Sequence, residues 1–262
     1  MATIEYEVRD KIAYVTLNRP SSLNAINNEM SRAWNEVWER FRDDDDAWTA
    51  ILTGAGDRSF CSGADLKEMR SNHDSKTHRG NPFGGDPRPL RPSEELGVWK
   101  PIIAAINGWV MGGGVVFAMD CDIRIASERA VFGLPEVELG IVTTWWGTVR
   151  ARAHMSFGRA LEFLLTGNHV TAEQAERWGF VNHVVPHDQL MSKAEEMARK
   201  INGNGPLAVR GIKEVSYRSL LDGIREAGRL EDVISIIAAQ SEDVQEGVRA
   251  WLEKRPPEFK GM

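Results

Sequence analysis

The sequence is poor in cysteine, in excess positive charge and in long apolar runs, and each shortage excludes a class of protein. Cys61 and Cys121 are the only cysteines among 262 residues, and their spacing matches no metal or redox motif. The formal net charge of -6 disfavours nucleic acid as a partner, because phosphate binding needs a basic surface. No apolar run approaches the ~20 residues that a membrane-spanning helix needs. We therefore expect neither a nucleic-acid nor a membrane partner.

The N-terminal segment MATIEYEVRD carries acidic residues and no apolar stretch, so we do not expect a signal peptide. Two buried thiols are typical of a reducing compartment, and we expect a cytoplasmic protein. His73 and His78 lie in a stretch over residues 71–97 that is rich in proline and glycine. No third ligand follows in the pattern, so solvated histidines are favoured and no metal site is expected.

Three consecutive glycines, Gly112 to Gly114, stand where the common nucleotide-binding motifs need other residues. The dinucleotide motif G-x-G-x-x-G is absent, and Val115 and Val116 replace the Lys-Ser/Thr pair of a phosphate loop. A glycine run fits a tight turn from a strand to a helix. It also fits a ligand that must touch the backbone where a side chain would be in the way. The residues alone leave both interpretations open.

Apolar patterning predicts an α/β fold. Strands are expected over residues 11–17, 49–53, 101–106 and 121–126, and helical spacing of large apolar residues predicts a helix over residues 30–41. Strands that alternate with helices favour parallel pairing in the sheet.

Beyond about residue 157 the pattern is expected to be helical to the end of the chain. Thr171 to Gln174 has the pattern of a capping box at the start of a helix. We divide the chain into an α/β core over residues 1–195 and a helical C-terminal region over residues 196–262. That region contains an apolar face made of Val233, Ile234, Ile236 and Ile237. We expect this face to pack either on the body of the protein or on another subunit.

Two glycine-containing segments follow predicted strands, namely FCSGADLKEM (60–69) and the turn at Gly112 to Gly114. Ligands bind at strand ends in open α/β sheets. If these two ends meet, the backbone N–H groups of Ala64 and Gly113 converge on one oxygen atom and form an oxyanion hole. A purely structural role for both turns is the alternative.

Glu136 follows Pro135 in the apolar segment VFGLPEVELG (131–140). A carboxyl group in such surroundings resists ionisation, which brings its pKa towards the range that suits a general acid or base. The alternative is a surface glutamate on a turn. We expect that ordinary role for Glu138, two residues further on.

Four of these segments together resemble the crotonase superfamily of enoyl-CoA hydratases, isomerases and their relatives. They are LNRP…LNA (17–25), FCSGADL (60–66), GWVMGGG (108–114) and FGLPEVELGI (132–141), and the likeness runs from about residue 4 to the C-terminal EKRPPEFKG. The resemblance implies a crotonase-like spiral of ββα units. It also implies a C-terminal helical trimerisation region, and hence a homotrimer or a dimer of trimers.

The resemblance implies a coenzyme A (CoA) thioester as substrate, so CoA is part of the substrate and no separate cofactor is expected. The N–H groups of Ala64 and Gly113 would hold the thioester oxygen and stabilise an enolate, and Glu136 would transfer protons. Leu23 and Ala25 would lie near the adenine end of CoA. The remaining residues expected to bind the substrate are Asp65, Leu66, Lys67, Gly112, Val116 and Trp145, together with Ala64 and Gly113 themselves.

The sequence departs from the family pattern at two places. Typical hydratases read Gly-Gly-Gly-x-Glu at the glycine turn, and that glutamate is one of two catalytic carboxylates; Val116 stands there in this chain. Trp145 and Trp146 replace small residues after Glu136. They either pack under the next helix, or one of them narrows or flattens the acyl pocket for a ring.

These features favour an enoyl-CoA hydratase-like lyase with a single catalytic glutamate. The rival enzymatic interpretations are an enoyl-CoA isomerase, which shuttles one proton, and a hydroxycinnamoyl-CoA hydratase-lyase. A non-catalytic CoA-binding or RNA-binding scaffold is the alternative of another class. The acidic charge counts against RNA, and the retained Glu136 counts against an inert scaffold.

Overall fold

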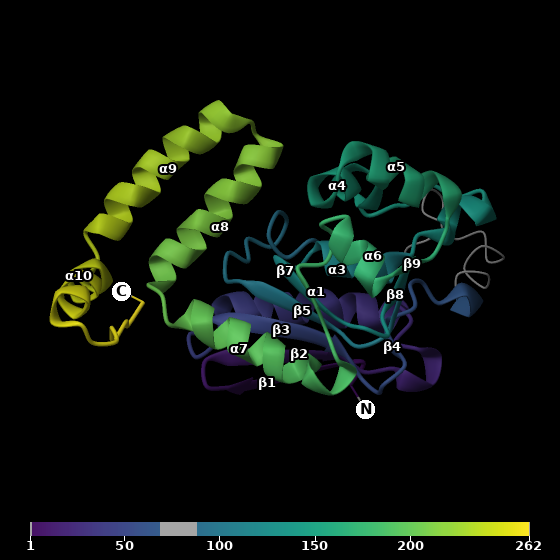
Figure 1. Cartoon of the computed structure of the whole chain (residues 1–262), viewed down its shortest axis with the longest axis horizontal. Coiled ribbons are helices and arrows are strands. Elements are labelled where there is room, and N and C mark those ends of the chain that lie inside the picture. Colours follow the sequence, from purple (N-terminus) through teal and green to yellow (C-terminus); the bar gives the residue numbers. More distant parts are fainter. Residues whose placement is uncertain (1, 69–87, 262) are drawn as a thin grey trace.

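A computed structural model describes residues 2–68 and 88–261 of the chain (Figure 1). His73 and His78, for which solvated positions were predicted, lie outside the described residues. The strands form two sheets. The larger, six-stranded sheet has the order β1 (Ile4–Arg9), β2 (Ile12–Leu17), β3 (Thr49–Gly54), β5 (Ile102–Ile106), β7 (Ile123–Ser127) and β10 (His183–Val185). The smaller has the order β4 (Ser59–Cys61), β6 (Trp109–Met111), β8 (Val131–Gly133) and β9 (Val170–Thr171).

The chain passes from one sheet to the other and back in a repeating spiral. β3, β5 and β7 are neighbours in the larger sheet, and each is followed along the chain by β4, β6 or β8 in the smaller one. Pairing is parallel throughout this spiral, and antiparallel only between β1 and β2 and between β8 and β9 among the described strands. The predicted α/β spiral of ββα units is therefore confirmed.

The four strands predicted from the sequence and the helix over residues 30–41 are all present, the latter as α1 (Asn28–Asp43). The expectation of helix from residue 157 to the end is wrong in two places. β9 and β10 interrupt this part of the chain and complete the edges of the two sheets. They are two and three residues long, too short to show the alternation that identifies a strand in a sequence.

Helices cover the outer face of the larger sheet and the end of the spiral. α7 (Leu190–Asn202) lies across the larger sheet, while α3 (Gly113–Met119) follows β6 directly. α4 (Gly147–His154), α5 (Phe157–Thr166) and α6 (Ala172–Arg177) lie together at the other side of the molecule in Figure 1. The capping box predicted at Thr171 is confirmed, because its hydroxyl accepts from the Gln174 N–H and the Gln174 side chain accepts from the Thr171 N–H.

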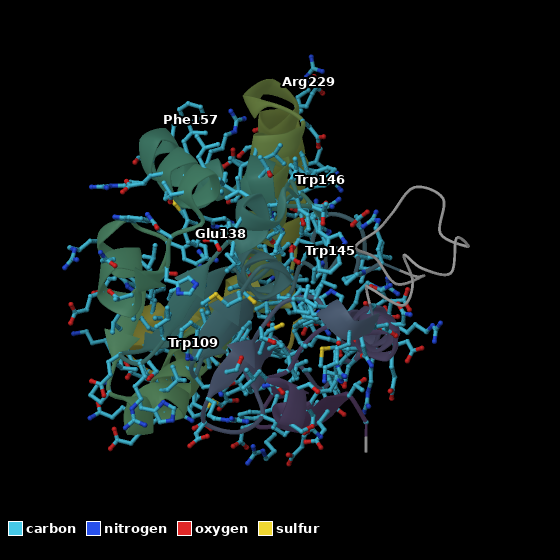
Figure 2. The ribbon with its side chains drawn as sticks, turned by 90° about the vertical axis from the view of Figure 1, so that its right-hand side faces the viewer. Trp109, Glu138, Trp145, Trp146, Phe157 and Arg229 are labelled. Carbon is cyan, nitrogen blue, oxygen red and sulfur yellow. The ribbon has the colours of Figure 1, made fainter. Side chains whose placement is uncertain are left out.

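The last three helices form the C-terminal region, namely α8 (Pro206–Leu221), α9 (Ile224–Ala239) and α10 (Glu242–Glu253). α8 and α9 form a hairpin that projects from the body of the molecule (Figure 1). The division placed at residues 195 and 196 falls inside α7, which still covers the sheet. Figure 2 shows Arg229 of α9 and Phe157 of α5 at the top of the molecule, far from Trp109 on β6.

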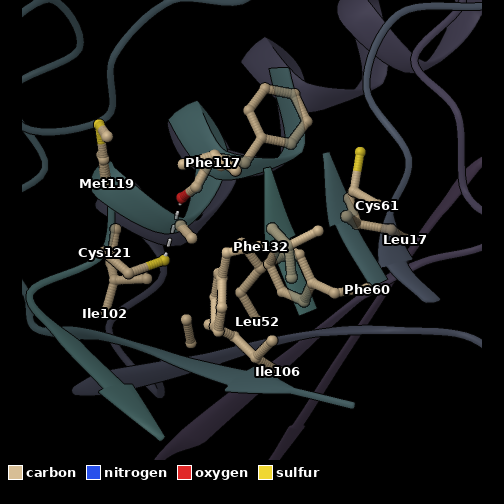
Figure 3. Packing of buried hydrophobic residues seen from close by; sticks show 14 of the residues in the cluster. Leu17, Leu52, Phe60, Cys61, Ile102, Ile106, Phe117, Met119, Cys121 and Phe132 are labelled. Atoms are coloured by element: carbon tan, nitrogen blue, oxygen red, sulfur yellow. Dashed lines mark hydrogen bonds between the residues drawn. The ribbon is translucent and has the colours of Figure 1, made fainter. Parts of the chain in front are cut away.

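The core consists of two layers that the central strands separate. Leu52 of β3 and Ile106 of β5 face the interior between the two sheets, where Phe60 of β4 and Phe132 of β8 meet them (Figure 3). Their neighbours in sequence, Ile51 and Ala105, face α7 instead. Both faces of the central strands are therefore buried, which explains their continuous apolar sequence.

Both cysteines are buried and free, as predicted, and burial raises the pKa of each thiol. In residues 2–68 and 88–261, no helix combines the length and the apolar character needed to cross a membrane. Within the same residues, no group of three or more His, Cys, Asp and Glu side chains is arranged to hold a metal ion.

Candidate active site

The two glycine-containing segments lie side by side because β4 and β6 are parallel neighbours, with Cys61 opposite Val110. A Cβ on Gly114 would lie 2.2 Å from the Cys61 carbonyl oxygen, and a Cβ on Gly63 would lie 2.7 Å from the Met111 carbonyl oxygen. Real Cβ atoms do not approach backbone this closely. Glycine is thus required at Gly63 and Gly114 so that the two backbones can touch.

This close approach brings two backbone N–H groups together. Ile26 and Ala64 form a parallel bridge in which the Ile26 N–H donates to Gly63 and the Asp65 N–H donates to Ile26, at 2.7 and 2.9 Å. The Ala64 N–H consequently points away from Ile26. Gly113 is the first residue of α3, so its N–H has no acceptor within that helix. The Gly113 nitrogen lies 3.3 Å from the Cβ position on Gly63.

Ala64 and Gly113 line a pocket of about 550 Å³. Every residue for which a site role was predicted also lines it, namely Leu23, Ala25, Ala64, Asp65, Leu66, Lys67, Gly112, Gly113, Val116, Glu136 and Trp145. Their roles in binding and catalysis remain predictions. Ser21 and Ser22 also line it and belong to the same loop as Leu23 and Ala25, NRPSSLNA (18–25), which the resemblance places along CoA. The lining residues that sequence reasoning missed are Ser62, Gly63, Met111, Pro135, Leu139, Ile141, Val142 and Thr144. Most of them adjoin a predicted residue, so extending each motif by one or two positions would have found them.

Glu136 lies in the short 3₁₀ helix Pro135–Leu139, and its carboxyl group reaches the glycine turn. Glu136 Oε1 lies 3.2 Å from the Cβ position on Gly112, whose φ of 51° and ψ of −121° also favour glycine. Burial raises the pKa of Glu136, while hydrogen bonds from its own N–H and from Thr143 lower it in part. Oε2 is buried, with no hydrogen-bond partner within the described part of the chain. Glu138 is exposed, as expected.

Val116 makes the wall beside Glu136 apolar. Its side chain is 2% exposed, and its Cγ2 atom lies 2.9 Å from the Cβ position on Gly147, the first residue of α4. Among the described residues that line the pocket, the ionisable side chains are Asp65, Lys67 and Glu136. Asp65 is paired with Arg19 at 3.0 Å. Glu136 is therefore the one carboxyl group in this lining without a cationic partner.

The sequence and the structure were compared with those of known proteins. The sequence matches the model of the enoyl-CoA hydratase/isomerase family over residues 7–262. The chain belongs to the enoyl-CoA hydratase/isomerase family. This confirms the resemblance to the crotonase superfamily that the sequence motifs indicated.

Relatives of this enoyl-CoA hydratase/isomerase align with it over almost its whole length. It is 36% identical to an (E)-benzylidenesuccinyl-CoA hydratase of Thauera aromatica, covering 98% of this chain and 99% of that protein. It is 39% identical to a short-chain-enoyl-CoA hydratase of Clostridium acetobutylicum, and the alignment covers 95% of this chain and 94% of that protein. The crystal structure of an enoyl-CoA hydratase from Bacillus anthracis superposes with a TM-score of 0.89 at 32% identity, covering 99% of this chain and all of that one.

The loop before α1 is held against the pocket by buried polar contacts. Arg19 donates to the Ala25 carbonyl and pairs with Asp65, which joins this loop to the Ala64 segment. The Asn24 side chain donates to the Ser59 carbonyl at 2.8 Å. Leu23 and Asn24 both have positive φ, at 53° and 55°, so the backbone turns sharply and Leu23 lines the pocket.

The two tryptophans after Glu136 point in different directions. Trp145 lines the pocket, whereas the ring of Trp146 lies under the Arg91 guanidinium at 3.6 Å and is 47% exposed. Trp145 thus has the place expected of a pocket-forming residue, while the exposure of Trp146 shows that it is not packed under the next helix.

We predict that Gly114→Ala destabilises the protein, because the new Cβ would meet the Cys61 carbonyl at 2.2 Å and force β4 away from α3. Overpacking of this kind typically costs about 1–3 kcal/mol. The measurement is the free energy of unfolding in urea. Gly228→Ala within α9 is the matched control, since its Cβ position has no neighbour within 4 Å among the described residues beyond the backbone of its own helix. Equal stability of both variants would contradict the close contact.

Proposed function

We propose that this enoyl-CoA hydratase-like enzyme adds water to a 2-enoyl-CoA thioester with Glu136 as its one catalytic carboxylate. The observation that carries the proposal is the position of Glu136. Its partly buried carboxyl group lies against the glycine turn at Gly112, and Ala64 and Gly113 line the same pocket. A proton-transfer group and two hydrogen-bond donors are thereby within reach of one bound acyl group.

In this proposal, the thioester oxygen accepts hydrogen bonds from the N–H groups of Ala64 and Gly113. These bonds polarise the carbonyl group and stabilise the negative charge that develops on the oxygen when a nucleophile attacks the β-carbon. The donors are parts of a backbone held in place by β4, β6 and α3, so little reorganisation accompanies the reaction. Removing one such donor typically lowers the rate by about 10²–10³.

Glu136 would perform both proton transfers. Its carboxylate takes a proton from water as the water oxygen bonds to the β-carbon, and the electron pair of the double bond moves towards the thioester to give the enolate. The protonated carboxyl group then gives that proton to the α-carbon. The sum is one water molecule added across the double bond, and Glu136 is returned to its ionised state.

The CoA part of the substrate would lie along the loop of Leu23 and Ala25 and the segment Ala64–Lys67. Lys67 carries the one positive charge among the described lining residues and suits the CoA phosphates. The ion pair between Arg19 and Asp65 holds the two segments in a fixed relation. CoA enters as part of the substrate, so this scheme requires no separate cofactor.

Double-bond isomerisation is the second candidate, and the single unpaired carboxyl group favours it. An isomerase needs one group that removes a proton at one carbon and returns it at another. Incubating the protein with 2-enoyl-CoA and 3-enoyl-CoA separates the two when the products are resolved by chromatography and weighed by mass spectrometry. Hydration adds the mass of one water molecule, whereas isomerisation moves the double bond without changing the mass. A protein that did neither but still bound CoA esters would be a scaffold.

We predict that Glu136→Gln lowers the rate of hydration by about 10²–10⁴, because an amide neither takes nor gives the proton. Binding of a saturated CoA ester should change little, since the amide has nearly the same shape as the carboxyl group. The test compares steady-state turnover with calorimetric binding of butanoyl-CoA. Near-wild-type turnover of the variant would remove Glu136 from the mechanism.

The pH profile of the wild type provides an independent check on Glu136. Burial raises the pKa of this carboxyl group, and the proposed base must be ionised in the free enzyme. The rate constant kcat/KM should therefore rise with pH through a midpoint above ~4.3, the usual value for glutamate. A midpoint at or below that value would show that the base lies in a more exposed or better hydrogen-bonded position.

We predict that Val116→Glu raises the hydration of crotonyl-CoA by up to about 10²-fold, because a second carboxyl group can share the proton transfers. Burial opposes the gain, since Val116 is 2% exposed and packs against α4. Val116→Gln is the matched control, because it adds the same bulk without an ionisable proton. Rates and melting temperatures are measured for all three proteins. Equal rates for the two variants would show that valine only shapes the pocket.

We also propose a homotrimer or a dimer of trimers in the cytoplasm. The outer surface of α9 and α10 exposes large apolar side chains, namely Val233, Ile236, Ile237, Val248, Trp251 and Leu252. Ile234 differs, because it is turned towards α8, where its Cγ2 lies 2.4 Å from the Cβ position on Gly211. Exposed apolar patches of this kind mark association surfaces. The buried free thiols suit a reducing compartment.

We predict that light scattering at micromolar concentration gives the mass of three or six chains. The physical reason is that association removes the apolar side chains of α9 and α10 from water. The chain mass of 29.3 kDa makes the possible states easy to separate. A stable monomer at this concentration would contradict the proposed assembly.

A further inference from the structure

Trp145 is placed against the backbone that carries the proposed oxyanion donor. A Cβ on Gly113 would lie 2.6 Å from Trp145 Cζ3 and 3.4 Å from Cε3, so the edge of the indole touches the bare α-carbon. Glycine at this position leaves room for the ring. An acyl group whose thioester oxygen reaches the Gly113 N–H must therefore continue past Trp145, which lines the same pocket.

A buried aromatic stack fixes the orientation of this ring. Phe117 of α3 lies behind Trp145, with centroids 6.4 Å apart and planes within 16°. Trp34 of α1 lies behind Phe117 at 3.6 Å and 9°, and the Trp34 Nε1–H donates to the Leu90 carbonyl at 2.9 Å. Trp34 and Phe117 are almost completely buried. Trp145 is thus the outermost member of a stack of nearly parallel rings that ends at the pocket.

The backbone adopts an uncommon conformation to place this ring. Trp145 and Trp146 have φ values of 51° and 65°, in the left-handed region that bulky side chains rarely occupy. Gly147 follows at once and is packed against Thr143 and Val116, where its Cβ position is 2.6 and 2.9 Å from their side chains. Such conformations persist where surrounding structure enforces them, and they concentrate at ligand sites.

We propose that Trp145 makes this pocket selective for 2-enoyl-CoA thioesters that carry an aromatic ring on the β-carbon. The inference rests on the proposed function and names the substrate class of the same site. A ring in the acyl group would pack against Trp145 and extend the stack of Phe117 and Trp34. Leu139, Ile141 and Val142 add apolar lining for it. Offset or edge-to-face contact with an aromatic wall favours a ring over an alkyl chain of similar area.

The experiment measures binding separately from turnover. We compare 3-phenylpropanoyl-CoA with octanoyl-CoA, two saturated esters of similar apolar area that cannot be hydrated, by calorimetry on the wild type, Trp145→Phe and Trp145→Leu. The wild type should bind the phenyl ester at least about tenfold more tightly. Trp145→Leu should reduce this preference to about threefold or less by weakening the phenyl ester more than the octanoyl ester, and Trp145→Phe should keep most of it. Circular dichroism checks that each variant is folded.

Three results would overturn the inference. They are equal weakening of both esters by Trp145→Leu, an unchanged affinity of that variant for both esters, and tighter binding of the phenyl ester once the indole is removed. The first would make Trp145 a support for the turn, the second would place it outside the acyl path, and the third would make it an obstruction. The same variants are then tested for hydration of cinnamoyl-CoA and crotonyl-CoA. Failure of all proteins to hydrate either ester would contradict the proposed function and leave the binding result standing.

Discussion

The contact between two stretches of bare backbone is the constraint on which the rest of the site depends. The Cys61 carbonyl lies where a Cβ on Gly114 would be, and the Met111 carbonyl lies where a Cβ on Gly63 would be. Parallel pairing of β4 with β6 creates this contact, and the spiral of the chain creates that pairing. Without it, Ala64 and Gly113 would not line one pocket together with Glu136.

The same close packing gives the pocket its electrostatic character. Burial of the Glu136 carboxyl group raises its pKa, and the apolar side chains of Val116 and Trp145 line the same pocket. A low local polarity also strengthens hydrogen bonds to a developing oxyanion. In the proposed mechanism, valine in place of the second glutamate of typical hydratases removes one proton carrier, so that hydration and isomerisation would both depend on Glu136.

Much of the fold could be predicted, because the central strands bury both faces and their apolar sequences stand out; Ile51 and Leu52 face opposite layers of the core. β9 and β10 were missed because they are too short to show a pattern. The motif resemblance brought together the residues that line the pocket. The place of Trp145 in the pocket lining was predicted, but its stacking on Phe117 of α3 was not, because that contact follows from positive φ values at Trp145 and Trp146 and from packing between distant segments.

The central claim is that the backbone N–H groups of Ala64 and Gly113 polarise the thioester carbonyl of a bound substrate. Isotope-edited infrared spectroscopy tests it directly, with butanoyl-CoA that carries ¹³C at the thioester carbonyl. Two hydrogen bonds from fixed donors in a pocket shielded from water should lower the C=O stretching frequency of the bound ester below its value in water. A frequency equal to or higher than that of the free ester would show that the carbonyl oxygen does not bind between these two groups.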